Sequence, residues 1–211
     1  MAVVSISRQF GAGGRTLGEM VAGELGYHFL HESQLDQLAA EVDKSNGGDT
    51  EQQSHYHTQV IELLASLAPS NFMDRWTGSQ GDDRQHLECL TQVIQRLAEE
   101  GKAVLLGRGA QFVLRYRPDT VRVLLVAELP HRVSFMVQNY DMDEATAKRL
   151  IAEADKKRAR FLNNFYPGEP DESSLYHLVL NTSLITLQGA TNLVTRLVRR
   201  TEEKLKQQAL A

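Results

Sequence analysis

The chain has 211 residues, of which 42% are hydrophobic and 24% are charged, and its formal net charge is −4 at pH 7. This composition excludes collagen-like, wholly disordered and disulfide-scaffold proteins, and the acidic balance disfavours a nucleic-acid coat protein, since such proteins are usually basic. A single cysteine, Cys89, permits no internal disulfide and no metal site built from thiols alone. A reducing, cytoplasmic compartment is therefore expected.

No stretch of the sequence approaches the ~20 apolar residues of a membrane span. The N-terminus also lacks the charged and apolar regions of a secretory signal. We therefore expect one domain over residues 1–211 that binds neither a membrane nor nucleic acid. Whether it acts as a monomer or as a homodimer stays open at this point.

The first half of the chain predicts short strands that alternate with amphipathic helices. Val3–Ser7 is a β-rich run, a glycine turn follows it, and apolar residues then recur at helical spacing as far as Gly26. A short apolar run over 27–30 and a helix over 35–42 come next. Residues 44–55 are polar, with Asn-Gly-Gly-Asp at their centre, and predict a mobile loop.

The second half continues this alternation of strands and helices. Its predicted elements are strands over 103–106, 120–127 and 178–180, and helices over 87–97, 130–140, 143–163 and from 187 onward. Strands separated by helices imply an α/β fold, in which a parallel sheet carries helices on both faces. In such sheets ligands bind beyond the carboxyl ends of the strands.

Four polar or glycine-rich features fall at those predicted strand ends. They are the glycine turn after Ser7, His31-Glu32, Gly107-Arg108-Gly109, and residues 128–132. Because the carboxyl ends of parallel strands meet at one edge of a sheet, these features predict a single site.

The turn over residues 7–16, Ser-Arg-Gln-Phe-Gly-Ala-Gly-Gly-Arg-Thr, lies between a strand and a helix. Its glycines let backbone N–H groups approach a ligand closely, and the helix N-terminus adds a positive dipole end, so the turn suits a phosphate. The standard phosphate loop is G-x-x-x-x-G-K-[ST]. If Arg15-Thr16 stands for the Lys-Thr pair, Gln9 replaces the first glycine of that pattern.

The run from Ile6 to Arg15 resembles the opening of the cytidylate kinase-like family, a branch of the P-loop nucleoside monophosphate kinases. Further segments resemble the family's later motifs in the family's order: Leu106–Ala110, Asp155–Phe161 and Tyr176–Ser183. The resemblance implies a three-layer α/β/α P-loop fold with a helical lid at about 152–174. It also implies ATP and magnesium as cofactors, and a nucleoside monophosphate acceptor, with CMP or dCMP expected.

The predicted roles follow from phosphoryl transfer, which needs charge neutralisation and alignment more than covalent help. Arg15, Arg108 and Arg158 are the expected catalytic residues, and the hydroxyl of Thr16 is expected to meet magnesium. The ATP phosphates are expected to contact Phe10, Gly11, Ala12, Gly13, Gly14, Arg15, Thr16 and Arg160. The acceptor is expected to contact His31, Glu32, Arg108 and Arg132.

The usual lysine of the phosphate loop is missing, and two alignments of the turn differ in where it would fall. One places it on Gly14 and the other on Arg15. Both alignments place Arg15 within one residue of the lysine position. Arg15 is therefore expected to supply the positive charge on the β- and γ-phosphates, with Arg8 and the lid as alternatives. The missing lysine also keeps open a nucleotide-binding regulatory protein without kinase turnover. Glycine at 109, and histidine at 31 and 177, stand where the family often has aspartate, which keeps open another small acceptor.

Overall fold

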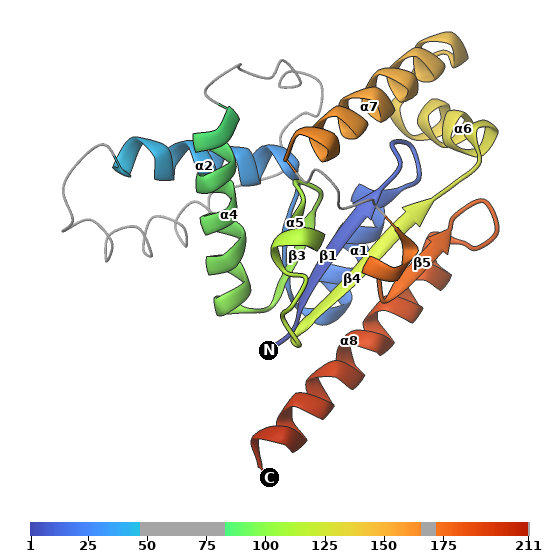
Figure 1. Cartoon of the computed structure of the whole chain (residues 1–211). Helices are drawn as coiled ribbons and strands as arrows, with labels where there is room; N and C mark the ends of the chain where they lie inside the picture. The colour runs from blue at the N-terminus through green and yellow to red at the C-terminus, as the bar shows by residue number, and fades with distance from the viewer. Residues whose placement is uncertain (47–82, 166–171, 211) are drawn as a thin grey trace.

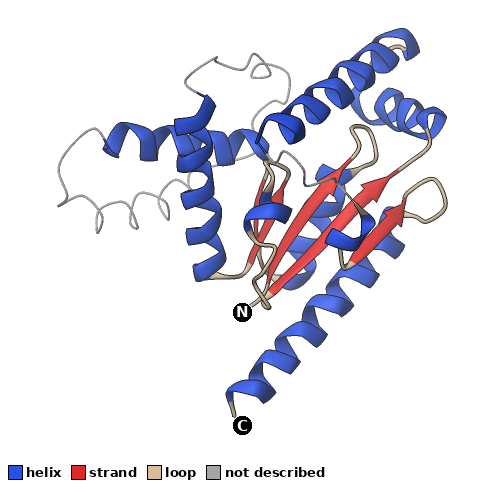
Figure 2. Cartoon of the chain, viewed as in Figure 1, coloured by secondary structure: helices blue, strands red, loops and turns tan. Residues whose placement is uncertain are grey.

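A parallel five-stranded sheet in the order β2-β3-β1-β4-β5 forms the centre of the protein (Figure 2). The computed structural model describes residues 1–46, 83–165 and 172–210. The strands are β1 (Val3–Arg8), β2 (His28–Leu30), β3 (Ala103–Leu106), β4 (Thr120–Val126) and β5 (Leu178–Asn181). Every pairing is parallel, which confirms the predicted sheet.

Helices cover both faces of this sheet and give three layers (Figure 1). One face carries α1 (Gly14–Leu25) and α8 (Leu187–Ala209), and the other carries α2 (Glu32–Asn46), α4 (Asp83–Glu100) and the short α5 (Ala110–Val113). A hairpin of α6 (Leu129–Tyr140) and α7 (Glu144–Phe165) lies at the carboxyl end of the sheet. A 3₁₀ turn, Ser173–Leu175, leads into β5.

The central strand β1 explains why its sequence is apolar on both sides. Val4 and Ile6 belong to the core formed with α1 and α8, whereas Val3 belongs to the core formed with α2 and α4. Successive side chains of a strand point to opposite faces, so a strand covered on both faces needs a nearly continuous apolar run. Burial from both sides thereby fixes the end of β1, where the glycine turn begins.

Most predicted elements are found, with differences at their ends. Helix α2 continues through Asn46, into the predicted 44–55 loop, and residues 47–55 lie outside the described residues. The first part of the predicted lid is the end of α7, whereas residues 166–171 lie outside the described part. Helix α5 was not predicted, because a single turn is too short to show a helical period. Among the helices described, none is long and apolar enough to cross a membrane.

Helix α1 lies directly on β2 because Gly18 carries no side chain. A Cβ at Gly18 would meet the ring of Phe29, with Cζ at 2.8 Å and Cδ2 at 2.9 Å. Five residues later on the same helix, Gly23 is exposed, and a Cβ there would meet nothing within 4 Å. These two glycines of one helix therefore have opposite environments.

We predict that alanine at these two positions changes stability in opposite directions. Gly18→Ala lowers the free energy of unfolding by about 1–3 kcal/mol, because the added methyl group overpacks against Phe29. Gly23→Ala raises it by about 0.5–1 kcal/mol, because alanine is the better helix former and the space is open. Urea denaturation followed by circular dichroism measures both. A stable Gly18→Ala protein would contradict the close packing of α1 on β2.

Candidate functional site

The glycine turn between β1 and α1 leaves the start of α1 open for a ligand. Gly13 is the N-cap residue, with a left-handed φ of 80°, and no side chain caps the helix. The first amides of an α-helix have no partner within the helix, so they are oriented toward whatever lies in the turn. The start of α8 differs, since there the Thr186 hydroxyl accepts a 3.1 Å hydrogen bond from the Gly189 amide. The turn therefore suits an anion such as phosphate.

Thr16 lies in the first turn of α1 and is half-buried. A hydroxyl at this place suits magnesium, which keeps several of its ligands from water and phosphate. Within residues 1–46, 83–165 and 172–210, no group of three or more His, Cys, Asp and Glu residues could hold a metal ion.

The turn after β3 carries the second arginine motif in a strained backbone. Arg108 has a φ of 52°, between Gly107 at 77° and Gly109 at 72°. A non-glycine residue in this region is uncommon and costs of order 1–3 kcal/mol, and such residues gather at functional sites. From this turn the Arg108 guanidinium reaches α2, where it pairs with Asp36.

Asp36 is a functional candidate that the sequence prediction missed. Besides Arg108, it lies 3.6 Å from His86 Nε2 of α4. Burial alone would raise the pKa of Asp36, but the nearby His86 and the charge of Arg108 outweigh it and lower the pKa. Asp36 and Glu32 are four residues apart on α2, which places both carboxylates on one helix face. This four-residue spacing from Glu32 is the feature of the sequence that could have identified Asp36 as a site residue.

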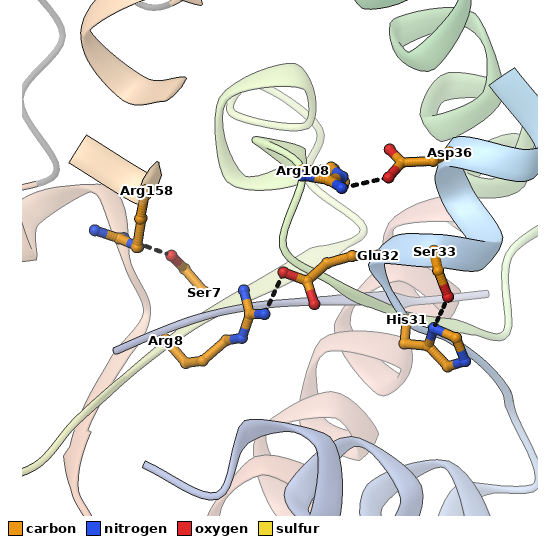
Figure 3. A network of polar contacts seen from close by, with 8 residues as sticks. All are labelled: Ser7, Arg8, His31, Glu32, Ser33, Asp36, Arg108 and Arg158. Atoms are coloured by element: carbon orange, nitrogen blue, oxygen red, sulfur yellow. Dashed lines mark hydrogen bonds and ion pairs between the residues drawn. The ribbon is translucent and has the colours of Figure 1, made fainter. Parts of the chain in front are cut away.

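Arg8, the last residue of β1, connects the two turns. Its guanidinium pairs with Glu32 at the start of α2, and its side chain is 15% exposed. Figure 3 shows Arg8 and Glu32 between the Arg158–Ser7 contact and the Arg108–Asp36 pair. These polar contacts come from distant parts of the chain, as the predicted single site requires.

The α6–α7 hairpin rests on the glycine turn. Phe10 packs against the apolar residues that join the two helices. Arg132 of α6 is 8% exposed and donates to Asp155 of α7 at 2.8 Å and to the Phe10 carbonyl at 3.3 Å. A Cβ at Gly11 would lie 3.0 Å from the Cβ of Arg132. Arg132 joins the hairpin to the turn through these contacts, and its predicted contact with the acceptor stays a prediction.

The basic run on α7 divides between the site and the surface. Arg158 Nη2 donates to the Ser7 hydroxyl at 2.9 Å, and Ser7 ends the buried part of β1. Arg160 is exposed, since two residues on a helix lie about 200° apart around its axis. The structure thus brings Arg158 to the glycine turn and places Arg160 facing outward.

Arg15 and His31 lie near one another beside the turn. Arg15 Nε donates to Glu19 one turn further along α1 at 3.0 Å. The His31 Nδ1 and the Ser33 hydroxyl are 2.9 Å apart (Figure 3). Burial and then the charge of Arg15 lower the pKa of His31, which favours the neutral imidazole at pH 7. Their roles as phosphate and acceptor ligands stay predictions.

The model of the cytidylate kinase-like family matches residues 3–184, which include both glycine turns and α7. The chain belongs to this family. A cytidylate kinase of Methanopyrus kandleri is 34% identical over 142 residues, covering 61% of this chain and 74% of that protein. A cytidylate kinase of Methanocaldococcus jannaschii is 24% identical over 196 residues, covering 92% and 95%.

Solved structures agree on the fold of this family member. An uncharacterized protein from Eubacterium ventriosum superposes with a TM-score of 0.68 at 16% identity, covering 94% of this chain and 99% of that one. A gluconokinase from Sinorhizobium meliloti superposes with a TM-score of 0.51 at 16% identity, covering 98% and 97%. The predicted family and the three-layer α/β/α P-loop fold are therefore confirmed.

We predict that the Arg132–Asp155 pair holds the hairpin together. Asp155→Ala leaves a buried guanidinium without its carboxylate and lowers the free energy of unfolding by about 1–3 kcal/mol, the smaller end reflecting the exposed side of Asp155. Glu153→Ala is the matched control on the same helix, since its pair with Arg149 is exposed and its loss costs less than about 0.5 kcal/mol. Hydrogen exchange of the α6 amides separates local from global unfolding. Equal effects of the two variants would contradict a structural role of the pair.

We also predict that Arg15 controls the titration of His31. Arg15→Gln removes a cation that disfavours the imidazolium, so the pKa of His31 rises and the ring protonates at a higher pH. Titration of the ring protons by nuclear magnetic resonance measures the shift. Arg199→Gln, which removes an exposed arginine of α8, leaves that pKa unchanged. An unaltered His31 in Arg15→Gln would show that the two groups do not interact.

Proposed function

We propose that this protein transfers the γ-phosphate of ATP, bound with magnesium, to a nucleoside monophosphate, with CMP or dCMP as the expected acceptor. The observation that carries the proposal is the uncapped start of α1 at a sheet edge that also holds arginines from three other segments. Arg8 ends β1, Arg108 follows β3 and Arg158 lies on α7. Phosphoryl transfer needs this arrangement, because its transition state gathers charge on phosphate oxygens.

In the proposed reaction, a phosphate oxygen of the acceptor attacks the γ-phosphorus of ATP. The bond from that phosphorus to the bridging oxygen breaks, and the bridging oxygen leaves with ADP. Backbone amides at the start of α1 hold the donor phosphates, and Arg108 holds the acceptor phosphate in line with them. Magnesium neutralises phosphate charge when bound, and the Thr16 hydroxyl is the residue proposed to hold it. Arg158 closes the site from α7.

A kinase with another small acceptor is the second candidate. The observation that favours it is Gly109, which offers no side chain for base recognition where cytidylate kinases often carry aspartate. Its φ of 72° also disfavours a larger residue, so a replacement would strain the turn. A nucleotide acceptor would place its phosphate at Arg108, whereas a small alcohol has no phosphate to place there, so the dependence of turnover on an acceptor phosphate separates the two candidates.

A coupled assay with ATP, magnesium and a panel of acceptors tests the proposal. The panel contains CMP, dCMP, UMP, AMP and GMP, and small alcohols such as gluconate and shikimate. Turnover with CMP or dCMP, at a kcat/KM at least about tenfold above the other acceptors, supports the proposed function. Turnover only with an alcohol supports the second candidate. ATP binding without turnover of any acceptor would favour a regulatory nucleotide-binding protein.

We predict that Arg108 acts on the acceptor and not on ATP. Arg108→Ala raises the KM for the acceptor by about 10–100-fold, the loss expected when a charge-assisted phosphate contact is removed. Arg108→Lys recovers only part of it, because an ammonium lacks the planar pair of donors. The control Arg199→Ala changes neither constant by more than about twofold. An increased KM for ATP with an unchanged acceptor KM would place Arg108 on the donor instead.

A further inference from the structure

The glycine turn carries glycine at residue 14, where one alignment places the phosphate-loop lysine, and the structure shows what fills that space. A Cβ at Gly14 would lie 2.8 Å from Cγ of Arg8, 3.1 Å from its Cδ and 3.2 Å from its Cβ. Contacts below 3.0 Å essentially never occur for real Cβ atoms. The aliphatic stem of Arg8 therefore crosses the start of α1 at the point where a lysine at residue 14 would emerge.

The backbone at Gly14 does not itself require glycine. Gly14 is the first residue of α1 and is absent from the residues with positive φ, whereas Gly11 and Gly13 are among them. A side chain at residue 14 would thus be free of left-handed backbone strain, and the three atoms nearest to its Cβ all belong to Arg8. The Arg8 side chain can cross the start of α1 because residue 14 is glycine, and residue 14 has no room for a side chain because Arg8 lies there.

The other end of Arg8 meets the second glycine turn. Arg8 Nη1 lies 2.9 Å from the place that a Cβ of Gly107 would take, and Nη2 pairs with Glu32. Arg8 therefore passes over Gly14 with its stem and over Gly107 with its guanidinium. Gly107 precedes Arg108, so the charge of Arg8 lies between the proposed donor site and the proposed acceptor site (Figure 3).

We propose that Arg8 supplies the cation on the β- and γ-phosphates that the missing lysine would supply, and that Gly14 admits it. The inference rests on the proposed function. A guanidinium is permanently charged and has five N–H donors, of which Glu32 occupies one, so further donors remain for phosphate oxygens. Glu32 is a positioning residue, because it holds the guanidinium between the two turns. Arg15 suits this role less, since its Nε is directed along α1 to Glu19.

Rescue by an exchanged pair of residues tests this assignment. Isothermal titration calorimetry measures binding of ATP and of AMP, which lacks the β- and γ-phosphates. Arg8→Ala weakens ATP binding by about 10–100-fold and AMP binding by less than about twofold. Gly14→Lys alone also weakens ATP binding, because the lysine collides with Arg8. The double variant Arg8→Ala/Gly14→Lys binds ATP more tightly than either single variant, since the lysine then has both space and position.

A second variant keeps the positive charge of Arg8 and shifts only the position of the Arg8 side chain. Gly14→Ala displaces the Arg8 stem and weakens ATP binding at least about threefold, whereas the same change in an Arg8→Ala background has a smaller effect, because only the 3.2 Å contact with the Cβ of residue 8 remains. Thermal unfolding of every variant checks that the fold is kept. Arg199→Ala, far along α8, is the control for loss of an arginine and leaves ATP binding within about twofold of wild type.

The outcomes separate this inference from the proposed function. Wild-type ATP affinity in Arg8→Ala, or a double variant no better than its parents, overturns the role of Arg8 while the proposed function stands. A larger loss of ATP affinity in Arg15→Ala than in Arg8→Ala overturns it as well and assigns the charge to Arg15. A wild-type protein that binds no ATP overturns the proposed function and the inference together.

Discussion

The position of β1 in the middle of the sheet is the constraint on which the site depends. β1 pairs with β3 on one side and β4 on the other, so its carboxyl end is held by two ladders and by helices on both faces. The turns that follow β1 and β3 therefore begin at fixed points beside each other. Arg8 needs no loop to carry it to Glu32 and Gly107, and this rigidity suits chemistry that depends on alignment.

The α6–α7 hairpin packs directly against the glycine turn at the carboxyl edge of the sheet. Phe10 belongs both to the glycine turn and to the apolar cluster of the hairpin, and Arg132 fastens the same turn to α7 through Asp155. The hairpin and the turn therefore share contacts, and a change in either one is transmitted to the other by packing. Closure of the site, where it occurs, has to begin from this anchored arrangement.

Much of the fold could be predicted from sequence, because its elements are regular and buried. The apolar run of β1, the spacing in α1 and the glycine turn between them lie within one stretch of chain and follow local rules. The pairing of Arg132 with Asp155 was not predictable, since two helices must first fold against each other. Arg8 was only an alternative, because motif reasoning looks for the cation next to Thr16. Its path over Gly14 appears only when strand and helix are placed together.

The buried Arg132 also constrains how the sequence can change over generations. Its Cβ leaves no room for a side chain at residue 11, and its guanidinium needs the carboxylate at residue 155. A lineage that altered one of these positions alone would pass through a protein with a collision or with an uncompensated charge in its interior. The guanidinium at residue 132 and the carboxylate at residue 155 thus depend on each other. The glycine at residue 11 is required by the backbone and Cβ of a distant helix as well as by its own left-handed φ of 83°.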